Sequence, residues 1–190
     1  RDFRLYVEVL KEFLHNAHNA AHKADILTEI ADVQRRNLRD FAAAEATLTE
    51  ALGYVPTNKK IQENLAQLFD ASDRFDSIFD ILGEEIFREH LEGMLAAKPQ
   101  PNQKILDAAR VLASSVDTNQ RGRFYFELAE RLDSVDAQCT AVFEASHFED
   151  ISKSQLLRFL SRVDVHGDEE DRAAVLRTSL ALEDDLDRRV

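Results

Sequence analysis

The amino-acid sequence repeats itself, and the period of this repeat restricts the fold more than any other feature of the chain. Apolar residues stand at offsets of 0, 3 and 7 in three successive copies: Val7, Leu10 and Leu14; Phe41, Ala44 and Leu48; Phe75, Ile78 and Leu82. That spacing places each triplet along one stripe of an α-helix. A period of about 34 residues is typical of stacked repeat units. We therefore expect the three stripes to be buried in register, with Phe41 and Phe75 in the same environment.

The helices between these stripes repeat as well, at a spacing that is longer by one: Ile26, Ile30 and Ala31 match Ile61, Leu65 and Ala66. The longer spacing implies one additional residue in the earlier helix. Polar turns at 37–40 and 71–74 precede the Phe stripes, and Pro56 interrupts the next junction, where Thr57 or Asn58 can cap a helix. The unit is therefore helix, tight turn, helix, tight turn, and we expect Ala44 and Ala66 to lie where helices approach closely.

This unit resembles the tetratricopeptide repeat. Its small–large–small–Pro pattern is that of the family's second helix, carried here by Ala44, Leu48, Ala51 and Pro56. The turns Arg39-Asp40-Phe41 and Asp73-Arg74-Phe75 are similar to the family's Gly-Asp-Tyr turn, and Ala31 and Ala66 stand where its first helix has Gly or Ala. The second copy departs from the pattern at Ile78, where a small residue is usual. The resemblance covers residues 24–90 and extends over 1–23, which would form the second helix of a preceding unit. The chain resembles the divergent bacterial arrays in which the first helix carries one additional residue.

The resemblance implies an all-α fold, a right-handed helical-repeat (TPR-like) α-solenoid of antiparallel helix hairpins with about ten helices. We expect tetratricopeptide-like repeats over 1–96 and a Pro-containing break over 97–102. Residues 103–190 are expected to form further helical hairpins, either as degenerate repeats or as a capping bundle. Helical patterns in this half cover 102–116, 119–132, 135–148, 152–164 and 168–186, and they are separated by Asp117–Asn119, Ser134, Ser152 and Gly167-Asp168.

The charge of the chain restricts its partners. Its 36 Asp and Glu outnumber its 24 Lys and Arg, the net charge is −12, and both halves share the excess of acid. The electrostatic attraction that supports binding to nucleic acid or to an anionic membrane is therefore missing. Apolar runs are only a few residues long, so we expect no membrane insertion. Cys139 is the only cysteine, which excludes an intrachain disulfide and indicates a reducing, cytoplasmic location. Because the chain starts at Arg1 without a Met or a signal sequence and ends on a helical pattern, we interpret it as a piece of a longer protein.

Three histidines offer the sharpest hypothesis for chemistry. On one continuous helix, the spacing of His15, His18 and His22 would place all three imidazoles on one face, where they could share a metal ion. The alternative is that residues 14–23 form a polar junction between two helices. We prefer the junction, because a metal site would need a helix that runs through the predicted turn and no nearby carboxylate is placed to orient the imidazoles.

The remaining candidates for chemistry have ordinary structural interpretations. Cys139 could act as a nucleophile with His147, but a lone cysteine on an apolar helix face is more often a core residue. The acidic run 167–171 lacks the alternating ligands of a calcium loop and instead fits a helix N-terminus. The sequence contains no Gly-rich phosphate loop, no nucleophile elbow and no cysteine pair of metal-binding spacing. We therefore expect no catalytic residues, no metal, no cofactor and no enzymatic activity.

In the tetratricopeptide family, the first helix of each unit lines a concave groove that takes peptides. By that resemblance, the exposed groove positions are Asp25, Thr28, Asp32 and Arg35 in one unit and Lys60, Glu63, Asn64, Gln67 and Asp70 in the next. The alternative is that these positions form only a solvated face. The family's clamp for a C-terminal carboxylate would need basic residues where Thr28 and Glu63 stand. A mixed and mostly acidic groove suits a basic or polar partner segment better.

Two functions follow from this reading. The first is a non-catalytic protein–protein interaction scaffold that binds a partner segment in its concave groove. The second is a regulatory or assembly region of a larger multidomain protein whose activity lies outside these residues.

Overall fold

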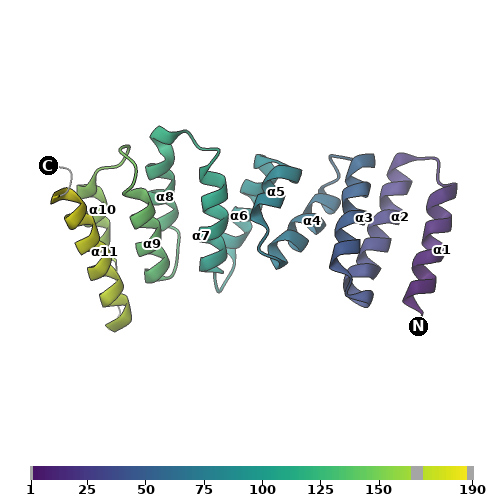
Figure 1. The fold of residues 1–190 in the computed structure, drawn as a ribbon, viewed down its shortest axis with the longest axis horizontal. Helices are drawn as coiled ribbons and strands as arrows, with labels where there is room; N and C mark the ends of the chain where they lie inside the picture. Colours follow the sequence, from purple (N-terminus) through teal and green to yellow (C-terminus); the bar gives the residue numbers. More distant parts are fainter. Residues whose placement is uncertain (1, 164–168, 188–190) are drawn as a thin grey trace. The chain divides into compact units, whose positions relative to one another are not determined.

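A computed structural model of the chain describes residues 2–163 and 169–187. In this part of the chain eleven α-helices and two short helical turns account for the secondary structure, and no β-strand occurs. The all-helical class is therefore confirmed (Figure 1). The chain divides into two compact units, unit 1 over Arg1–Ile86 and unit 2 over Phe87–Val190. The predicted Pro-containing break at 97–102 lies inside unit 2.

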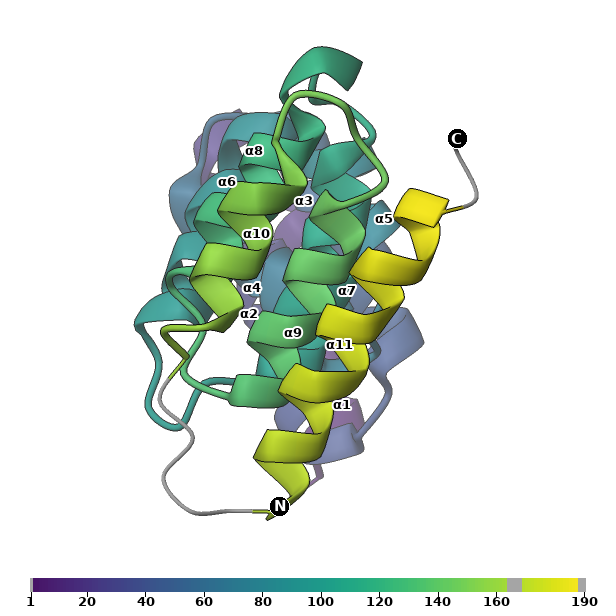
Figure 2. The ribbon, with the colours of Figure 1, turned by 90° about the vertical axis from the view of Figure 1, so that its left-hand side faces the viewer.

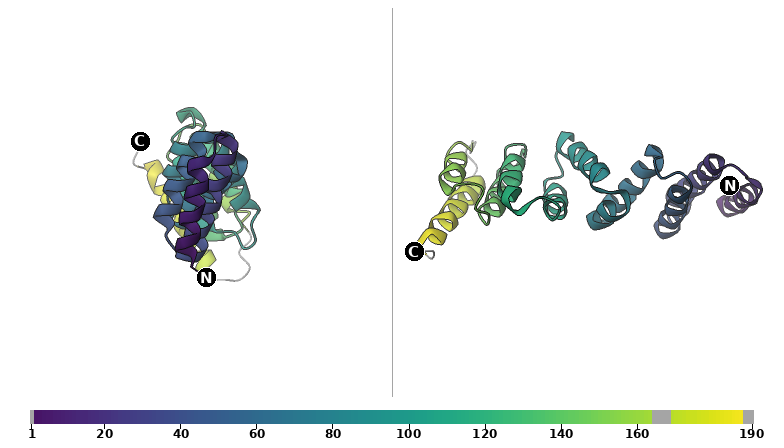
Figure 3. Two further views of the ribbon diagram at one scale, coloured as in Figure 1. Left: turned by 90° about the vertical axis from the view of Figure 1, so that its right-hand side faces the viewer. Right: turned by 90° about the horizontal axis from the view of Figure 1, so that it is seen from above.

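Unit 1 consists of helices that each pack against the next one along the chain. Contacts join α1 to α2, α2 to α3, α3 to α4 and α4 to α5, and these helices stand side by side in that order (Figures 1 and 3). Their bounds are α1 (Phe3–Asn16), α2 (Ala20–Val33), the π-helical turn η1 (Gln34–Leu38), α3 (Phe41–Tyr54), α4 (Lys59–Ala71) and α5 (Phe75–Leu82). Helix α6 (Glu84–Ala96) begins at the end of unit 1 and continues into unit 2.

Polar side chains cap the N-termini of four of these helices. The side chains of Asp2, Asn19, Asp40 and Asn58 each accept a hydrogen bond from a backbone N–H in the first turn of the helix that follows. These bonds satisfy donors that an α-helix leaves without an internal partner. Of the two predicted caps after Pro56, Asn58 is the one that the chain uses.

The two turns that precede the Phe stripes share an unusual backbone conformation. Arg39 and Asp73, which stand one repeat period apart, have φ values of 57° and 54°, in the left-handed region. At the second turn, the N–H of Arg74 donates to the carbonyl of Phe69 at 2.9 Å and that of Asp73 donates to Asp70 at 3.1 Å. This is the Schellman pattern of a helix end.

The first turn contains the additional residue that the longer spacing between the first helices predicts. There the N–H groups of Arg39 and Asp40 both donate to the carbonyl of Gln34, and the backbone forms the π-helical turn η1. A π-helical turn holds more residues than an α-helical turn, so the additional residue is accommodated within η1.

The apolar stripes are buried with one exception. Buried members are Val7, Leu10, Ala44, Leu48, Phe75 and Ile78, and half-buried members are Leu14 and Leu82. Phe75 is 3% exposed, whereas Phe41 is 52% exposed. The expectation that these two residues share one environment is therefore wrong. Two local differences accompany it: the turn before Phe41 is wider by one residue, and the counterpart of the buried Phe69 is the polar Gln34, whose amide oxygen accepts a hydrogen bond from Thr47 at 2.9 Å.

The two alanines expected at close helix contacts are buried. Ala44 is 0% exposed on α3 and Ala66 is 4% exposed on α4. Both methyl groups are therefore part of the packed core of unit 1.

Unit 2 contains the helices predicted for the second half of the chain. After α6 they are α7 (Asn102–Ala113), the 3-10 turn η2 (Thr118–Gln120), α8 (Arg121–Ala129), α9 (Val135–Ala145), α10 (Lys153–Leu160) and α11 (Glu169–Asp187). Ser134 and Ser152, which separate the helical patterns in the sequence, cap α9 and α10, the latter in a reciprocal capping box with Gln155. Acidic residues occupy the first turn of α11, where the helix dipole favours them. The predicted turn at Gly167-Asp168 lies outside the described residues.

The packing order in unit 2 differs from that in unit 1. Helix α8 packs against α9, but α9 then packs mainly against α11, and α10 contacts α11 as well (Figure 2). The strictly sequential packing of unit 1 is therefore not repeated in this half of the chain.

The Pro-containing segment is fastened to its unit by a buried glutamine. Gln100 is 8% exposed, and its Nε2 donates to the carbonyl oxygens of Leu95 at 2.8 Å and Arg131 at 3.1 Å. Its Oε1 accepts a hydrogen bond from the N–H of Asp133 at 3.0 Å. The segment 97–102 therefore joins the ends of α6 and α8 and is part of the packed structure of unit 2.

Candidate functional site

The nine predicted groove residues lie on α2, η1 and α4 of unit 1, and all but one have access to solvent. Asp25, Lys60, Glu63 and Gln67 are exposed, and Asp32, Arg35, Asn64 and Asp70 are half-buried. Thr28 is the exception: it is 6% exposed, and its hydroxyl donates to the carbonyl of Ala24 at 2.7 Å within its own helix. The prediction that Thr28 faces a groove is wrong, because this position lies on the core side of α2 between the buried Ala24 and Ala31.

Three of these residues contact one another across two helices. Arg35 Nη1 donates to Gln67 Oε1 at 3.4 Å, and Arg35 Nη2 donates to Asp32 Oδ1 at 3.3 Å. Arg36 Nε lies 3.6 Å from the same Asp32 oxygen. The side chain of Arg35 is 21% exposed, so it is held between α2 and α4. The structure thus brings Asp32, Arg35 and Gln67 together and leaves Asp25, Lys60 and Glu63 apart from this network.

A shallow hollow lies beside this network, and we call it the arginine hollow. It is lined by Arg35, Arg36, Arg39, Phe41, Gln67, Leu68 and Ala71. These residues supply three guanidinium groups, one amide and three apolar side chains, and no carboxylate is among them. Two of them, Arg35 and Gln67, belong to the predicted groove.

The π-helical turn positions the residues that line the arginine hollow. The wide turn over Gln34–Leu38 carries Arg35 and Arg36, and the left-handed conformation at Arg39 then reverses the chain. Asp40 caps α3 by accepting from the N–H of Ala43 at 3.0 Å, so Phe41 becomes the first residue of that helix. Cationic and aromatic side chains are therefore presented together at one turn. Single-turn π-helices of this kind occur often at functional sites.

Sequence reasoning missed Arg36, Arg39 and Phe41 as site residues. Phe41 belongs to the apolar stripe and was expected in the core, and the two arginines belong to a turn and not to the first helix that the family resemblance singled out. The available signal was the difference of one residue between the spacing of the stripes and the spacing of the first helices, which marks the turn where the two copies diverge.

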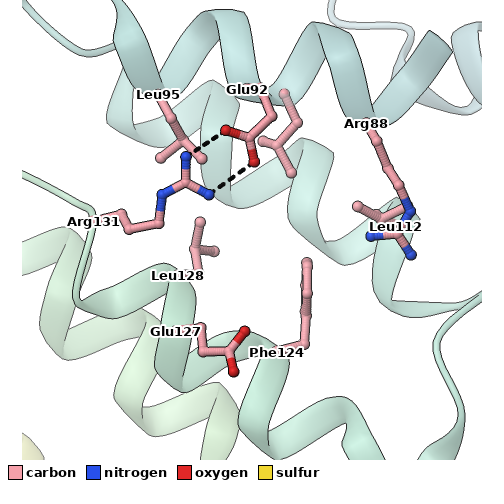
Figure 4. Close-up of a pocket in the computed structure, with 9 residues that line it drawn as sticks. Arg88, Glu92, Leu95, Leu112, Phe124, Glu127, Leu128 and Arg131 are labelled. Atoms are coloured by element: carbon pink, nitrogen blue, oxygen red, sulfur yellow. Dashed lines mark hydrogen bonds and ion pairs between the residues drawn. The ribbon is translucent and has the colours of Figure 1, made fainter. Parts of the chain in front are cut away.

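A second hollow occurs in unit 2, between α6, α7 and α8 (Figure 4). Leucines and Phe124 form its apolar surface, and its full lining is Arg88, Leu91, Glu92, Leu95, Leu112, Phe124, Glu127, Leu128 and Arg131. Figure 4 shows Glu92 and Arg131 pointing toward one another, and two hydrogen bonds of 2.8 and 2.5 Å join them. These bonds lower the pKa of Glu92 and raise the pKa of Arg131. With two arginines and two glutamates, this hollow carries no surplus charge.

The histidine cluster does not lie on one helix. Helix α1 ends at Asn16 and α2 begins at Ala20, so the chain turns between His15 and His22. The interpretation of this segment as a junction is confirmed. Among the residues that the structure describes, no group of three or more His, Cys, Asp or Glu side chains is arranged to hold a metal ion.

Cys139 is a core residue, as its position on an apolar helix face predicts. It is 3% exposed on α9. Burial raises the pKa of its thiol, and this effect outweighs the opposing hydrogen bond with Thr178. The reactive thiolate is therefore disfavoured. The ring of His147 packs edge-on against Phe143, with 4.9 Å between the ring centres.

Two further findings bear on function. Among the described helices, none is both long enough and apolar enough to cross a lipid bilayer. Comparison with family models, with curated proteins and with solved structures gives no match.

Proposed function

We propose that this chain is a non-catalytic protein-interaction module that holds a segment of a partner protein against the arginine hollow. The proposal includes the finer architecture, in which unit 1 is a tetratricopeptide-like piece of a right-handed solenoid. Sequential helix packing and the recurrence of a left-handed residue at Arg39 and Asp73, one repeat period apart, support that architecture.

The exposure of Phe41 is the observation that carries the proposal. An aromatic side chain has a large apolar surface, and leaving half of it in water forgoes the free energy of its burial. Phe41 lines the arginine hollow together with three arginines and with the apolar Leu68 and Ala71. Aromatic residues and arginine are the types most enriched where protein interfaces concentrate their binding energy. A partner that covers Phe41 would recover that free energy.

The chemistry of the lining residues favours binding over catalysis. Guanidinium, amide and hydrocarbon groups line the arginine hollow, and none of them exchanges a proton near neutral pH. General acid–base or nucleophilic catalysis requires a group that does.

A selection from random peptides displayed on phage tests the proposal. We expect the whole chain to enrich peptides whose binding weakens at least about tenfold in Phe41→Ala, as for an interface hot spot. Phe13→Ala is the matched control, because Phe13 is 61% exposed on α1 and does not line the hollow. Failure to enrich any peptide that distinguishes Phe41→Ala from this control would rule out the hollow as the binding surface.

One observation favours the second candidate function, an assembly region of a larger protein. Leu5, Val9 and Phe13 are 63%, 40% and 61% exposed, and their spacing of four places them on one stripe of α1. A helix with apolar residues on two faces is usually buried on both. Under this proposal, Phe13→Glu weakens the association of α1 with other parts of the larger protein, which co-purification measures. Peptide binding at the arginine hollow should stay unchanged. Unchanged co-purification would remove the support for this candidate.

A further inference from the structure

We infer that the partner segment that the arginine hollow accepts is acidic and carries an apolar side chain next to its carboxylates. This inference rests on the proposed function and names the chemistry of the partner. It reverses the preference for a basic segment that the average charge of the groove positions suggested.

The distribution of charge around the hollow supports an acidic partner. Arg35 and Arg36 share a single carboxylate oxygen, that of Asp32, at 3.3 and 3.6 Å. Among the residues that the structure describes, no side chain forms a hydrogen bond or an ion pair with Arg39. The lining of the hollow thus combines three guanidinium groups with no carboxylate, on a chain whose net charge is −12. A positive patch on an acidic protein attracts an acidic segment to that patch while the remaining surface repels it.

The geometry of the arginines fits carboxylates in particular. Arg35 is already oriented by its bonds to Asp32 and Gln67, so part of the entropy cost of fixing its side chain is met before a ligand arrives. The side chain of Arg36 is 68% exposed and can turn toward a ligand. A guanidinium group offers parallel N–H donors that match the two oxygens of a carboxylate.

The apolar part of the hollow argues for a peptide segment and against a simple anion. Phosphate or another small anion would engage only the guanidinium groups and would leave Phe41 in water. Phe41, Leu68 and Ala71 together form an apolar surface beside the arginines. A segment with a leucine or phenylalanine adjacent to Asp or Glu would cover both parts at once. The hollow in unit 2 has no excess of positive charge, because Arg131 is already paired with Glu92.

The test begins with the peptides that the phage library yields on the whole chain. We expect the enriched peptides to contain more Asp and Glu than Lys and Arg, next to an apolar residue. The most enriched peptide is then synthesised together with a counterpart in which every acidic residue is replaced by Lys. Fluorescence anisotropy should show the acidic peptide binding at least about tenfold more tightly, with an affinity that falls as salt is added.

Charge-reversed variants locate the effect. The double variant Arg36→Glu/Arg39→Glu should weaken binding of the acidic peptide about tenfold, since it removes two attractive charges and adds two that repel the peptide. Arg123→Glu is the control for a change of net charge away from the hollow, half as large as that of the double variant, because Arg123 is an arginine of unit 2 whose side chain is 78% exposed. Both variants change exposed residues, and circular dichroism checks that their helices are intact.

The outcomes separate this inference from the proposed function. Enrichment of basic or neutral peptides that still depend on Phe41 would overturn the acidic partner and leave the proposed function standing. Equal loss of binding in Arg123→Glu and in the double variant would also overturn it, because the effect would then come from net charge alone. Inorganic phosphate that competes as well as the peptide would overturn the apolar requirement. A library that yields no Phe41-dependent peptide would overturn the proposed function itself.

Discussion

Gln100 shows how a single side chain holds a loop that the sequence marks as a break. Its amide bonds to the backbone of Leu95, Arg131 and Asp133 while its side chain is buried. We expect Gln100→Ala to lower the free energy of unfolding by roughly 1–3 kcal/mol, because it leaves buried backbone groups without partners. Gln103→Ala is the control, since Gln103 is exposed and bonds only to Asp107 within its own helix. Chemical denaturation measures both variants, and equal effects would contradict the role of Gln100.

The ion pair between Glu92 and Arg131 should make the stability of unit 2 depend on pH. Hydrogen bonds from Arg131 lower the pKa of Glu92 below its ordinary value of 4.5. The ionised carboxylate therefore stabilises the folded state above about pH 4.5, and this contribution is lost as the pH falls below that value. Because both side chains are about half exposed, solvent screening limits the contribution to less than about 1 kcal/mol.

Comparing the wild type with Glu92→Gln by denaturation tests this prediction. Glu92→Gln should be the less stable of the two at pH 7, and the difference should shrink toward zero at acidic pH. Glu50→Gln, an exposed change on α3, is the control and should show no such trend. A difference that persists unchanged below pH 4 would mean that the ionised pair is not its cause.

At the scale of the element, the start of α8 depends on a glycine. The carboxylate of Asp150, from the connection between α9 and α10, accepts hydrogen bonds from the N–H groups of Gly122 at 3.0 Å and Arg123 at 2.8 Å. A Cβ on Gly122 would collide with this carboxylate and would lie 3.0 Å from Ile151 Cγ2 and 3.1 Å from Phe148 Cβ. The close approach therefore requires glycine.

Replacing glycine by alanine at two helical positions should have opposite effects. Gly122→Ala is expected to destabilise by roughly 1–3 kcal/mol through overpacking. Gly93→Ala, on α6, has no atom within 4 Å of the added Cβ and should stabilise by about 0.5–1 kcal/mol through helix propensity. Thermal melting of the two variants gives the sign directly. Destabilisation by both, or by neither, would show that the packing around Gly122 is not the determining factor.

The π-helical turn η1 shows how one inserted residue changes a surface without changing the fold. Helices α2 and α4 keep equivalent core residues, and the turns after them keep a left-handed residue at the same place. The additional residue lies in η1, next to the exposed Phe41 and the three arginines of the hollow. The irregular element in the repeat is therefore where the candidate site lies.

At the scale of the whole molecule, the division into two units makes unit 1 a candidate for independent folding. Its helices α1–α5 pack in sequence, and all residues of the arginine hollow lie within it. We expect residues 1–83 alone to unfold cooperatively on heating and to bind the same peptides as the whole chain. Circular dichroism and anisotropy measure the two properties. A fragment without a cooperative transition would show that α6 or unit 2 is needed to complete the fold.

Local features of this protein could be read from the sequence. The burial of Ala44 and Ala66 and the cap at Asn58 correspond to what the structure contains, and Ser134 and Ser152 stand at helix starts, where the sequence separates the helical patterns. The junction between the first two helices and the burial of Cys139 were predicted as well. Helix periodicity, capping and turn formation depend on residues within a few positions of one another, and those residues are visible in the sequence.

What only the tertiary structure decided is which side chains meet across helices. The sequence placed Arg35 and Gln67 in a groove, but it also placed Thr28 there and Phe41 in the core. In the structure Thr28 is buried and Phe41 is exposed. Exposure depends on what a neighbouring helix supplies at that point, and the two copies differ there by a one-residue insertion and by a polar Gln34 in place of Phe69. The sequence pattern thus predicted the helices and turns of unit 1 and most of its buried residues, whereas the packing between helices determined the arginine hollow, because the exposure of a particular side chain depends on what the neighbouring helix places against it.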